Sequence, residues 1–214
     1  MTDAPLALIA RGSDADVLAL DDRRVLRRYR RRNVPHEEVA IMTYARERGY
    51  PVPAVLDVSG ADLILERVTG PEMANDLFRR PWLVRAHAAT LAGLHHRLHA
   101  IAPPEWLRGD GPELAHLDLH PRNVLLAPSG PVVIDWANAR HAKPGFDVAM
   151  SAVITGGALL RWPVTWLRDL FVRDFLRAFP AAEWRGAWDD ALSYRRADDN
   201  VSDKEKAGLT KLRF

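Results

Sequence analysis

The sequence contains no cysteine, which excludes disulfide bonds and thiolate metal sites over all 214 residues. It also has no apolar run of about 18 residues or more, so we expect no transmembrane helix. The segment from Met1 to Pro5 lacks a basic stretch followed by a long apolar one, and no secretory signal is evident. Together these absences favour a cytoplasmic protein.

A strong excess of charge of one sign is absent too. Lys and Arg number 30 and Asp and Glu 28, which gives a formal net charge of +2. This balance gives the chain no large overall positive charge of the kind that favours nucleic-acid binding. Hydrophobic residues make up 48% of the chain, enough for the core of one compact unit or of two small lobes that share a cleft.

One local exception is a run of seven arginines between Arg23 and Arg32. It has two interpretations. Because Val25, Leu26 and Tyr29 interleave with the arginines, a β-strand with a solvated outer face is favoured. A nucleic-acid-binding patch is the less favoured alternative.

The most informative stretch covers residues 116–126, with the sequence H-L-D-L-H-P-R-N-V-L-L, and residues 132–136, with V-V-I-D-W. Each part includes a run of strand-forming apolar residues. Between them, residues 127–131 are rich in Pro, Ser and Gly and predict a hairpin turn. Such a hairpin would return Asp135 to the polar loop that opens the stretch.

Two carboxylates and one carboxamide would then share a small space, which suits phosphoryl transfer. Mg²⁺ prefers oxygen ligands, commonly one or two carboxylates together with nucleotide phosphates. Asp135 and Asn123 would hold the ion, and Asp118 would orient a substrate hydroxyl and accept its proton. Such transfer needs few protein groups, because the protein mainly positions reactants and neutralises charge. Taken singly, each motif also fits a capped turn or a strand end.

In this order the motifs resemble the catalytic and metal-binding loops of the aminoglycoside phosphotransferase family, small-molecule kinases related to choline kinases. Asp118 matches the catalytic aspartate, Asn123 and Asp135 match the metal ligands, and His116 matches a histidine that braces the loop. The resemblance implies a protein-kinase-like α+β fold with two lobes. It also implies ATP and Mg²⁺ as cofactors and a small-molecule hydroxyl as acceptor.

The expected N-terminal lobe, residues 1–68, is a small antiparallel sheet that binds the nucleotide. In it, a turn with Gly12 and Ser13 takes the place of the phosphate loop, although it is not glycine-rich and also fits an ordinary turn. Val25 matches the residue that covers the adenine. Arg27 stands where the family usually has a phosphate-binding lysine, and Arg28 is the alternative.

Two more nucleotide-site features follow from the resemblance. Glu38, early in a helix expected over residues 35–48, resembles the glutamate that fixes the phosphate-binding cation. Its neighbour Glu37 and a plain surface role are the alternatives. After the last strand, the backbone groups of Glu66 and Val68 resemble a hinge that reads the adenine edge.

The expected C-terminal lobe, residues 69–214, is mainly helical and carries the catalytic and metal-binding loops. Asp147 resembles an aspartate that anchors its loop by capping a helix N-terminus. His95 and His99 have i, i+4 spacing, but no third metal ligand is obvious, so a structural role is favoured for His95. Strands are expected over 6–20, with a break at 11–14, and over 23–29, 55–58 and 63–68. Helices are expected over 81–101, 149–160, 166–179 and 183–194. The tail is expected to form a short final helix packed by Leu209, Leu212 and Phe214 or to be partly disordered.

The sequence does not define the acceptor or the oligomeric state. An aminoglycoside would need an acidic cleft, and acidic side chains on the C-terminal helices are typical of solvated faces. A nucleotide-binding pseudokinase that acts as a partner-binding module is the alternative function. The thin phosphate loop and the missing lysine favour it, whereas the intact Asp118, Asn123 and Asp135 oppose it.

Overall fold

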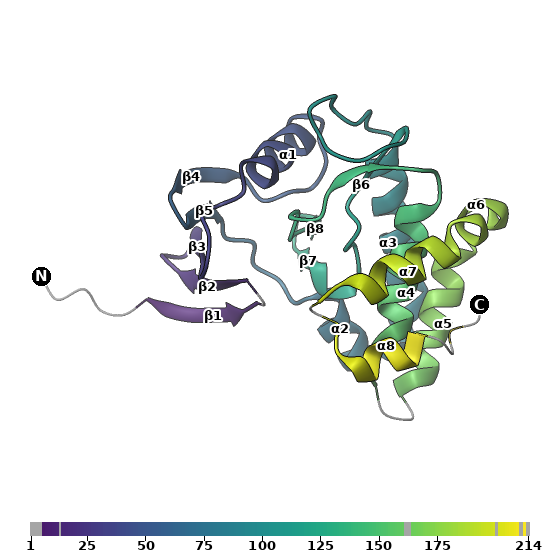
Figure 1. Cartoon of the computed structure of the whole chain (residues 1–214). Coiled ribbons are helices and arrows are strands. Elements are labelled where there is room, and N and C mark those ends of the chain that lie inside the picture. The colour runs from purple at the N-terminus through teal and green to yellow at the C-terminus, as the bar shows by residue number, and fades with distance from the viewer. Residues whose placement is uncertain (1–5, 13, 161–163, 200, 210–211, 213–214) are drawn as a thin grey trace, which may run out of the picture.

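A computed structural model describes residues 6–12, 14–160, 164–199, 201–209 and 212. The N-terminal part is a five-stranded antiparallel sheet in the order β1-β2-β3-β5-β4, with helix α1 beside it (Figure 1). The bounds are β1 Ala7–Arg11, β2 Ala15–Ala19, β3 Arg24–Tyr29, α1 His36–Glu47, β4 Val55–Ser59 and β5 Asp62–Glu66. These elements confirm the strands and the helix predicted for this part.

Local chemistry explains where these elements begin and end. The carboxylate of Asp21 accepts hydrogen bonds from the N–H groups of Arg23 and Arg24, at 2.8 and 2.7 Å, and so closes the turn between β2 and β3. Helix α1 is followed by Gly49, whose φ of 76° is a left-handed conformation that glycine adopts without strain. The buried side chains of Ile41, Met42 and Ala45 hold α1 in the core.

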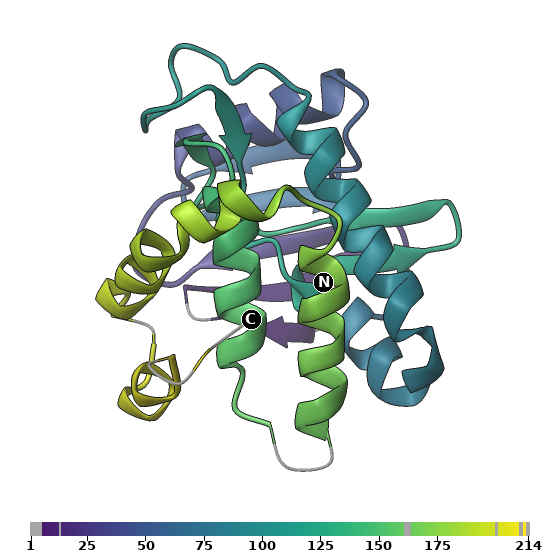
Figure 2. The same ribbon diagram turned by 90° about the vertical axis from the view of Figure 1, so that its right-hand side faces the viewer.

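The second part of the chain is mainly helical and lies on one side of the sheet (Figures 1 and 2). Helix α3 packs against α5, and α4 packs against both α5 and α7. The helices are α2 Met73–Arg79, α3 Val84–His99 after a short 3₁₀ turn Pro81–Leu83, α4 Phe146–Gly157, α5 Val164–Leu176, α6 Ala181–Gly186, α7 Trp188–Ala197 and α8 Asp203–Leu209. Two short antiparallel pairs complete it: β6 Glu113–Ala115 with β9 Arg140–Ala142, and β7 Val124–Ala127 with β8 Gly130–Val133.

Helix 183–194 was predicted as one element, and the structure corrects this: α6 ends at Gly186 and α7 starts at Trp188. Glycine is a poor helix former, so a break at this position costs little. The break also lets the two helices pack differently, because Trp184 joins the main core while Ala191 joins a second cluster.

The predicted short final helix is confirmed as α8. Leu209 is fully buried and Leu212 is 8% exposed, whereas Phe214 lies outside the described residues. The observed architecture therefore matches the expected α+β fold. No helix in the described part of the chain has the length and apolar character that crossing a bilayer requires.

The linker between β5 and α2 lies directly against β7. The N–H of Leu126 donates to the carbonyl of Pro71 at 2.9 Å, and Glu72 forms an isolated β-bridge with Leu125. A Cβ atom on Gly70 would overlap the Leu126 carbonyl. The division expected between residues 68 and 69 falls in this linker, so a close backbone approach fixes the hairpin β7–β8 relative to the chain that leaves the sheet.

We predict that Gly70→Ala lowers the free energy of unfolding by about 1–3 kcal/mol, because the added methyl group displaces backbone rather than a flexible side chain. Chemical denaturation followed by circular dichroism measures this change. Gly93→Ala, inside α3 with open space around its Cβ position, is the matched control and should stabilise by about 0.5–1 kcal/mol. Equal effects of the two substitutions would contradict the proposed backbone contact.

Candidate active site

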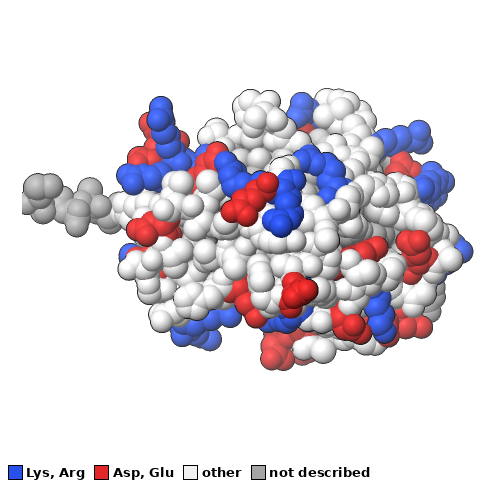
Figure 3. Space-filling view, turned by 90° about the horizontal axis from the view of Figure 1, so that it is seen from above, with Lys and Arg blue, Asp and Glu red and all other residues white. Residues whose placement is uncertain are grey.

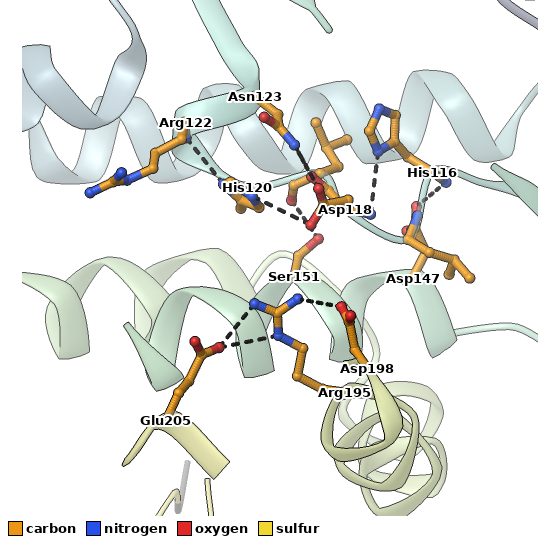
Figure 4. A network of polar contacts seen from close by, with 12 residues as sticks. His116, Asp118, His120, Arg122, Asn123, Asp147, Ser151, Arg195, Asp198 and Glu205 are labelled. Carbon is orange, nitrogen blue, oxygen red and sulfur yellow. Dashed lines mark hydrogen bonds and ion pairs between the residues drawn. The ribbon is translucent and has the colours of Figure 1, made fainter. Parts of the chain in front are cut away.

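The loop that follows β6 is held in a strained conformation by a buried carboxylate. Leu117 has a φ of 60°, which is uncommon for a residue other than glycine. Its N–H donates to Asp147 Oδ1 at 2.7 Å, and the N–H of His116 donates to Asp147 Oδ2 at 3.3 Å (Figure 4). The Nδ1 atom of His116 accepts the N–H of Asp118 at 3.3 Å, which confirms that this histidine braces the loop.

The carboxylate of Asp118 is fixed by two neighbours (Figure 4). Asn123 Nδ2 donates to Asp118 Oδ2 at 3.0 Å and to the Asp118 carbonyl at 2.8 Å, and His120 Nε2 lies 3.4 Å from Oδ1. Burial alone would raise the pKa of Asp118, but His120, with smaller effects from His116 and Arg195, holds this pKa below its ordinary value. The carboxylate is therefore ionised at neutral pH.

The predicted hairpin is confirmed. Strands β7 and β8 pair with Val124 opposite Val133. The ladder continues one step further, because the N–H of Ile134 donates to the carbonyl of Asn123 at 3.0 Å. Asp135 follows at once, with a φ of 67°. The hairpin thus returns Asp135 to the loop that holds Asp118 and Asn123.

Arg27 of β3 joins the sheet to this hairpin. Its Nη1 donates to Glu38 Oε1 at 2.7 Å, and its Nη2 donates to Asp135 Oδ1 at 2.8 Å. Burial opposes the charge, but Asp135 and Glu38 raise the pKa of Arg27 above its ordinary value. The expected pairing with Glu38 is confirmed, whereas Glu37 is exposed. The contact with Asp135 was not predicted from the sequence.

The alternatives to Arg27 and Glu38 lie elsewhere. Arg28 pairs with Asp62 at 2.7 Å on an exposed part of the sheet. Glu37 lies 3.6 Å from Arg108 and is exposed. Neither residue therefore takes part in the bridge from the sheet to the hairpin.

Tyr29 is a residue of this site that the sequence reasoning missed. Its hydroxyl donates to Glu38 Oε2, and its ring lies 5.1 Å from the Arg27 guanidinium carbon. Burial raises the pKa of Glu38 and outweighs the opposing effect of Arg27. The signal was available, because strand alternation places Tyr29 on the same face as Val25 and Arg27.

The donor set fits a hard divalent cation. Because Asn123 Nδ2 is used twice on Asp118, the Oδ1 atom is the oxygen that Asn123 can offer to a cation. The side chain of Asp135 is 43% exposed, and Arg27 contacts its Oδ1. Carboxylate and carboxamide oxygens are ligands that Mg²⁺ accepts. The assignment of Asn123 and Asp135 to Mg²⁺ stays a prediction.

The turn expected to cover the phosphates is a tight hairpin connection. The N–H of Gly12 donates to Ala15 O at 2.9 Å, and the Gly12 carbonyl accepts from Arg30 at 2.7 Å. The Gly12 N–H is therefore already used within the turn, and a phosphate contact here stays a prediction. Ser13 lies outside the described residues.

The contact of the backbone groups of Glu66 and Val68 with the adenine also stays a prediction. The carboxylate of Glu66 accepts the N–H of Ala54 at 3.0 Å and pairs with Arg46 at 3.2 Å, so this side chain is engaged within the N-terminal part. In the described part of the chain, the N–H of Val68 donates to no other group. Val25 is half-buried on β3, opposite Leu65 of β5.

Asp147 does not cap a helix, which corrects the expectation. Gly145 is the N-cap of α4, and Asp147 stands in the first turn with its carboxylate directed at the loop that carries Asp118. It also contacts His95 Nδ1 at 3.2 Å and His99 Nε2 at 3.1 Å. Burial would raise the pKa of Asp147, but the two histidines hold it well below its ordinary value.

Asp147 is the third potential metal ligand beside His95 and His99 that the sequence did not reveal. One ligand atom from each of His95, His99 and Asp147 lies within 4.8 Å of the others. Hydrogen bonding accounts for the other ring nitrogen of His95, since Ser151 Oγ lies 3.0 Å from His95 Nε2 and donates to Leu119 O at 2.6 Å. The structure therefore supports the structural role predicted for His95.

The arginine-rich strand is largely neutralised by carboxylates. At least five of its seven arginines form ion pairs: Arg24 with Asp21, Arg27 with Glu38 and Asp135, Arg28 with Asp62, Arg30 with Asp16, and Arg32 with Asp14. On the face shown in Figure 3, basic and acidic side chains lie next to one another. This pairing supports a solvated strand rather than a nucleic-acid patch.

The cluster at Asp147 predicts how stability depends on pH. Burial disfavours the charged form of His99, but Asp147 and Glu113 raise the pKa of His99 above 6.5. A group whose pKa is raised by folding stabilises fully below its unfolded pKa and loses that contribution as pH rises through the folded pKa. We predict that His99 lowers the urea midpoint as the pH is raised from about 6.5 to about 8.5, against the opposing contributions of His95 and His116, whose pKa values burial lowers.

His99→Gln should remove most of that decrease, as measured by urea denaturation at both pH values. His36→Gln, on an exposed residue that begins α1, is the control. The same decrease in the His99 variant as in the unmodified protein would contradict the assignment.

Comparisons with known proteins agree with this geometry. The sequence model described as "Phosphotransferase enzyme family" matches residues 6–117 and 97–189. A probable serine/threonine-protein kinase BUD32 homolog from Archaeoglobus fulgidus is 26% identical over 181 residues, which cover 77% of this chain and 83% of that protein.

Solved structures show the same fold. A choline/ethanolamine kinase family protein from Mesorhizobium loti has a TM-score of 0.66 at 16% identity, covering 97% of this chain and 86% of that one. The gentamicin complex of APH(2")-IIa has a TM-score of 0.64 at 15% identity, covering 98% and 92%. Since the family model spans most of the sequence, the chain belongs to the phosphotransferase enzyme family.

Proposed function

We propose that this protein transfers the γ-phosphoryl group of ATP to a hydroxyl group of a small molecule in a Mg²⁺-dependent reaction. Family membership supports a phosphotransferase that uses ATP. One observation carries the finer proposal: the hairpin brings Asp135 beside the loop of Asp118 and Asn123, and Arg27 ties Asp135 to Glu38.

Asp118 is the proposed acceptor of the substrate proton. The acceptor oxygen forms a bond to the γ-phosphorus while the bond from that phosphorus to the β–γ bridging oxygen breaks, and ADP leaves. The hydroxyl proton passes to the Asp118 carboxylate, which is ionised and held by Asn123 and His120. Its low pKa makes Asp118 a weak base, so it mainly orients the hydroxyl and takes the proton late.

Three residues organise the nucleotide side in this proposal. Asn123 and Asp135 would hold Mg²⁺, which when bound neutralises charge on the transferred phosphates. Arg27 supplies a permanent cation that Glu38 positions. Because a guanidinium offers several donors in one plane, Arg27 can contact a phosphate oxygen while it keeps its bond to Glu38.

A pseudokinase function is not favoured. The residues whose loss would mark such a protein are present and connected: Asp118 bonds Asn123, and Arg27 bonds Glu38 although the usual lysine is missing. Arg27 in place of the usual lysine therefore changes the kind of cation but keeps its ion pair with Glu38.

We predict that Asp118→Asn and Asp135→Asn each lower kcat by about 10²–10⁴-fold, since each carboxylate acts at the reacting phosphate or hydroxyl. The readout is ADP formation in the presence of Mg²⁺-ATP and a panel of hydroxylated metabolites. Asp190→Asn, an exposed residue of α7, is the control and should leave turnover unchanged. Full turnover in a folded Asp135→Asn protein would refute the metal assignment.

Substitutions at Arg27 separate the charge from the geometry. We expect Arg27→Ala to raise KM for ATP and lower kcat, because Glu38 stays buried without its cation. Arg27→Lys should retain more activity than the alanine variant, since an ammonium group still binds phosphate as a point charge. Arg28→Ala, which loses an exposed ion pair with Asp62, is the control. Native kinetics in the Arg27→Ala protein would show that this residue does not contact the nucleotide.

A further inference from the structure

A cavity of about 360 Å³ lies beside the catalytic loop, a size within the range of small-molecule sites. Its described walls come from α2, the loop after Asp118, the end of α4, the start of α5, and helices α7 and α8. A second, larger hollow of about 740 Å³ is lined by the turn between β2 and β3 and the end of β5. It has no catalytic-loop residue among its described lining.

The smaller cavity adjoins the proposed base. His120 lines it and lies 3.4 Å from Asp118 Oδ1. Arg195 of α7 lines it too, and its guanidinium points toward the loop that carries Asp118 (Figure 4). A hydroxyl group held in this cavity would therefore be close to Asp118.

Most of the cavity wall is apolar. Leu77, Ile154, Leu167 and Phe171 are buried side chains that line it. Phe78 of α2 lines it as well and is 45% exposed. Such a wall favours a ligand with an apolar body, because polar groups placed against it would lose hydrogen bonds to water without replacement.

The charged groups of the described lining are mainly cationic: Arg122, Arg168 and Arg195 against Glu205. Arg195 already pairs with Glu205 at 2.9 Å, and Arg168 pairs with Asp169 at 2.7 Å.

Arg122 differs from the other two arginines. It is exposed, and its guanidinium makes no hydrogen bond or ion pair with the part of the chain that the structure describes. Arg122 stands next to Asn123 and lines the same cavity. It is the cation best placed to bind an anionic group of a ligand.

We infer that the acceptor is a largely apolar molecule that carries a hydroxyl and an anionic group, and that Arg122 binds the anionic group. This inference rests on the proposed transfer reaction and names its acceptor class. A guanidinium binds carboxylate or phosphate oxygens through two parallel hydrogen bonds, which fixes orientation as well as position. With the anion at Arg122 and the apolar body against α4 and α5, the hydroxyl is directed toward Asp118. A polycationic acceptor would face a cavity whose charged groups are mainly positive, so its charges would be repelled.

The test uses three probes with the same phenyl group and a hydroxyl but different charge: phenyllactate, which is anionic, phenylpropanediol, which is neutral, and phenylalaninol, which is cationic. Phosphoryl transfer to each is followed with radiolabelled ATP, and binding is followed by thermal shift. We expect kcat/KM to decrease in the order anionic, neutral, cationic. A preference for phenylalaninol, or for an aminoglycoside such as kanamycin over all three, would overturn the inference.

Variants locate the anion site. Arg122→Glu should lower kcat/KM for phenyllactate by roughly 10-fold or more, because the carboxylate of the ligand is then repelled rather than attracted. The same substitution should have little effect on kcat/KM for the neutral phenylpropanediol. Arg173→Glu, an exposed residue of α5 outside the described cavity lining, is the control with the same charge change. An unchanged preference in the Arg122 variant would overturn its role.

Measurements of binding and of turnover distinguish a failure of this inference from a failure of the proposed transfer reaction. If phenyllactate raises the melting temperature and Arg122→Glu abolishes this shift, but no probe is phosphorylated, the anion-binding role of Arg122 stands, and the proposed transfer fails together with the acceptor class. If ATP is turned over with cationic acceptors alone, the transfer stands and the inference fails.

Discussion

The site depends on one nearly buried cation. The side chain of Arg27 is 15% exposed and binds Glu38, which is fully buried, and Asp135. The three residues come from the sheet, from α1 and from the chain after β8. A single guanidinium therefore links the sheet to the chain that follows the hairpin and carries the proposed metal ligand. Removal of such a partner leaves an uncompensated buried charge, which is far more costly than loss of a surface pair.

A second buried charge plays the corresponding part for the loop that carries Asp118. Asp147 accepts the N–H groups of His116 and Leu117 and is itself held by His95 and His99. The left-handed backbone of Leu117 persists because these bonds over-determine it. Arg27 thus contacts Asp135, and Asp147 holds the loop of Asp118, so two charge networks position the two parts of the proposed site. Such preorganisation is what phosphoryl transfer requires, since catalysis depends mainly on positioning.

Much of this was readable from the sequence. The hairpin over 127–131 followed from its Pro, Ser and Gly content, and the pairing of Arg27 with Glu38 followed from the family resemblance. The contact between Arg27 and Asp135, 108 positions apart, could not be read from local pattern, because it depends on how the sheet packs on the hairpin. The true role of Asp147 was hidden likewise, since a carboxylate near a helix start has the same local signature whether it caps that helix or reaches another loop.

The central claim is that Asn123 and Asp135 hold a divalent cation together with the nucleotide. The most direct measurement is the binding of Mn²⁺, used in place of Mg²⁺, followed by the electron paramagnetic resonance signal of the free ion with and without ATP. The account predicts ATP-dependent Mn²⁺ binding in the unmodified protein, and its loss in an Asp135→Asn protein that still binds ATP. Identical Mn²⁺ binding in the two proteins would contradict the account.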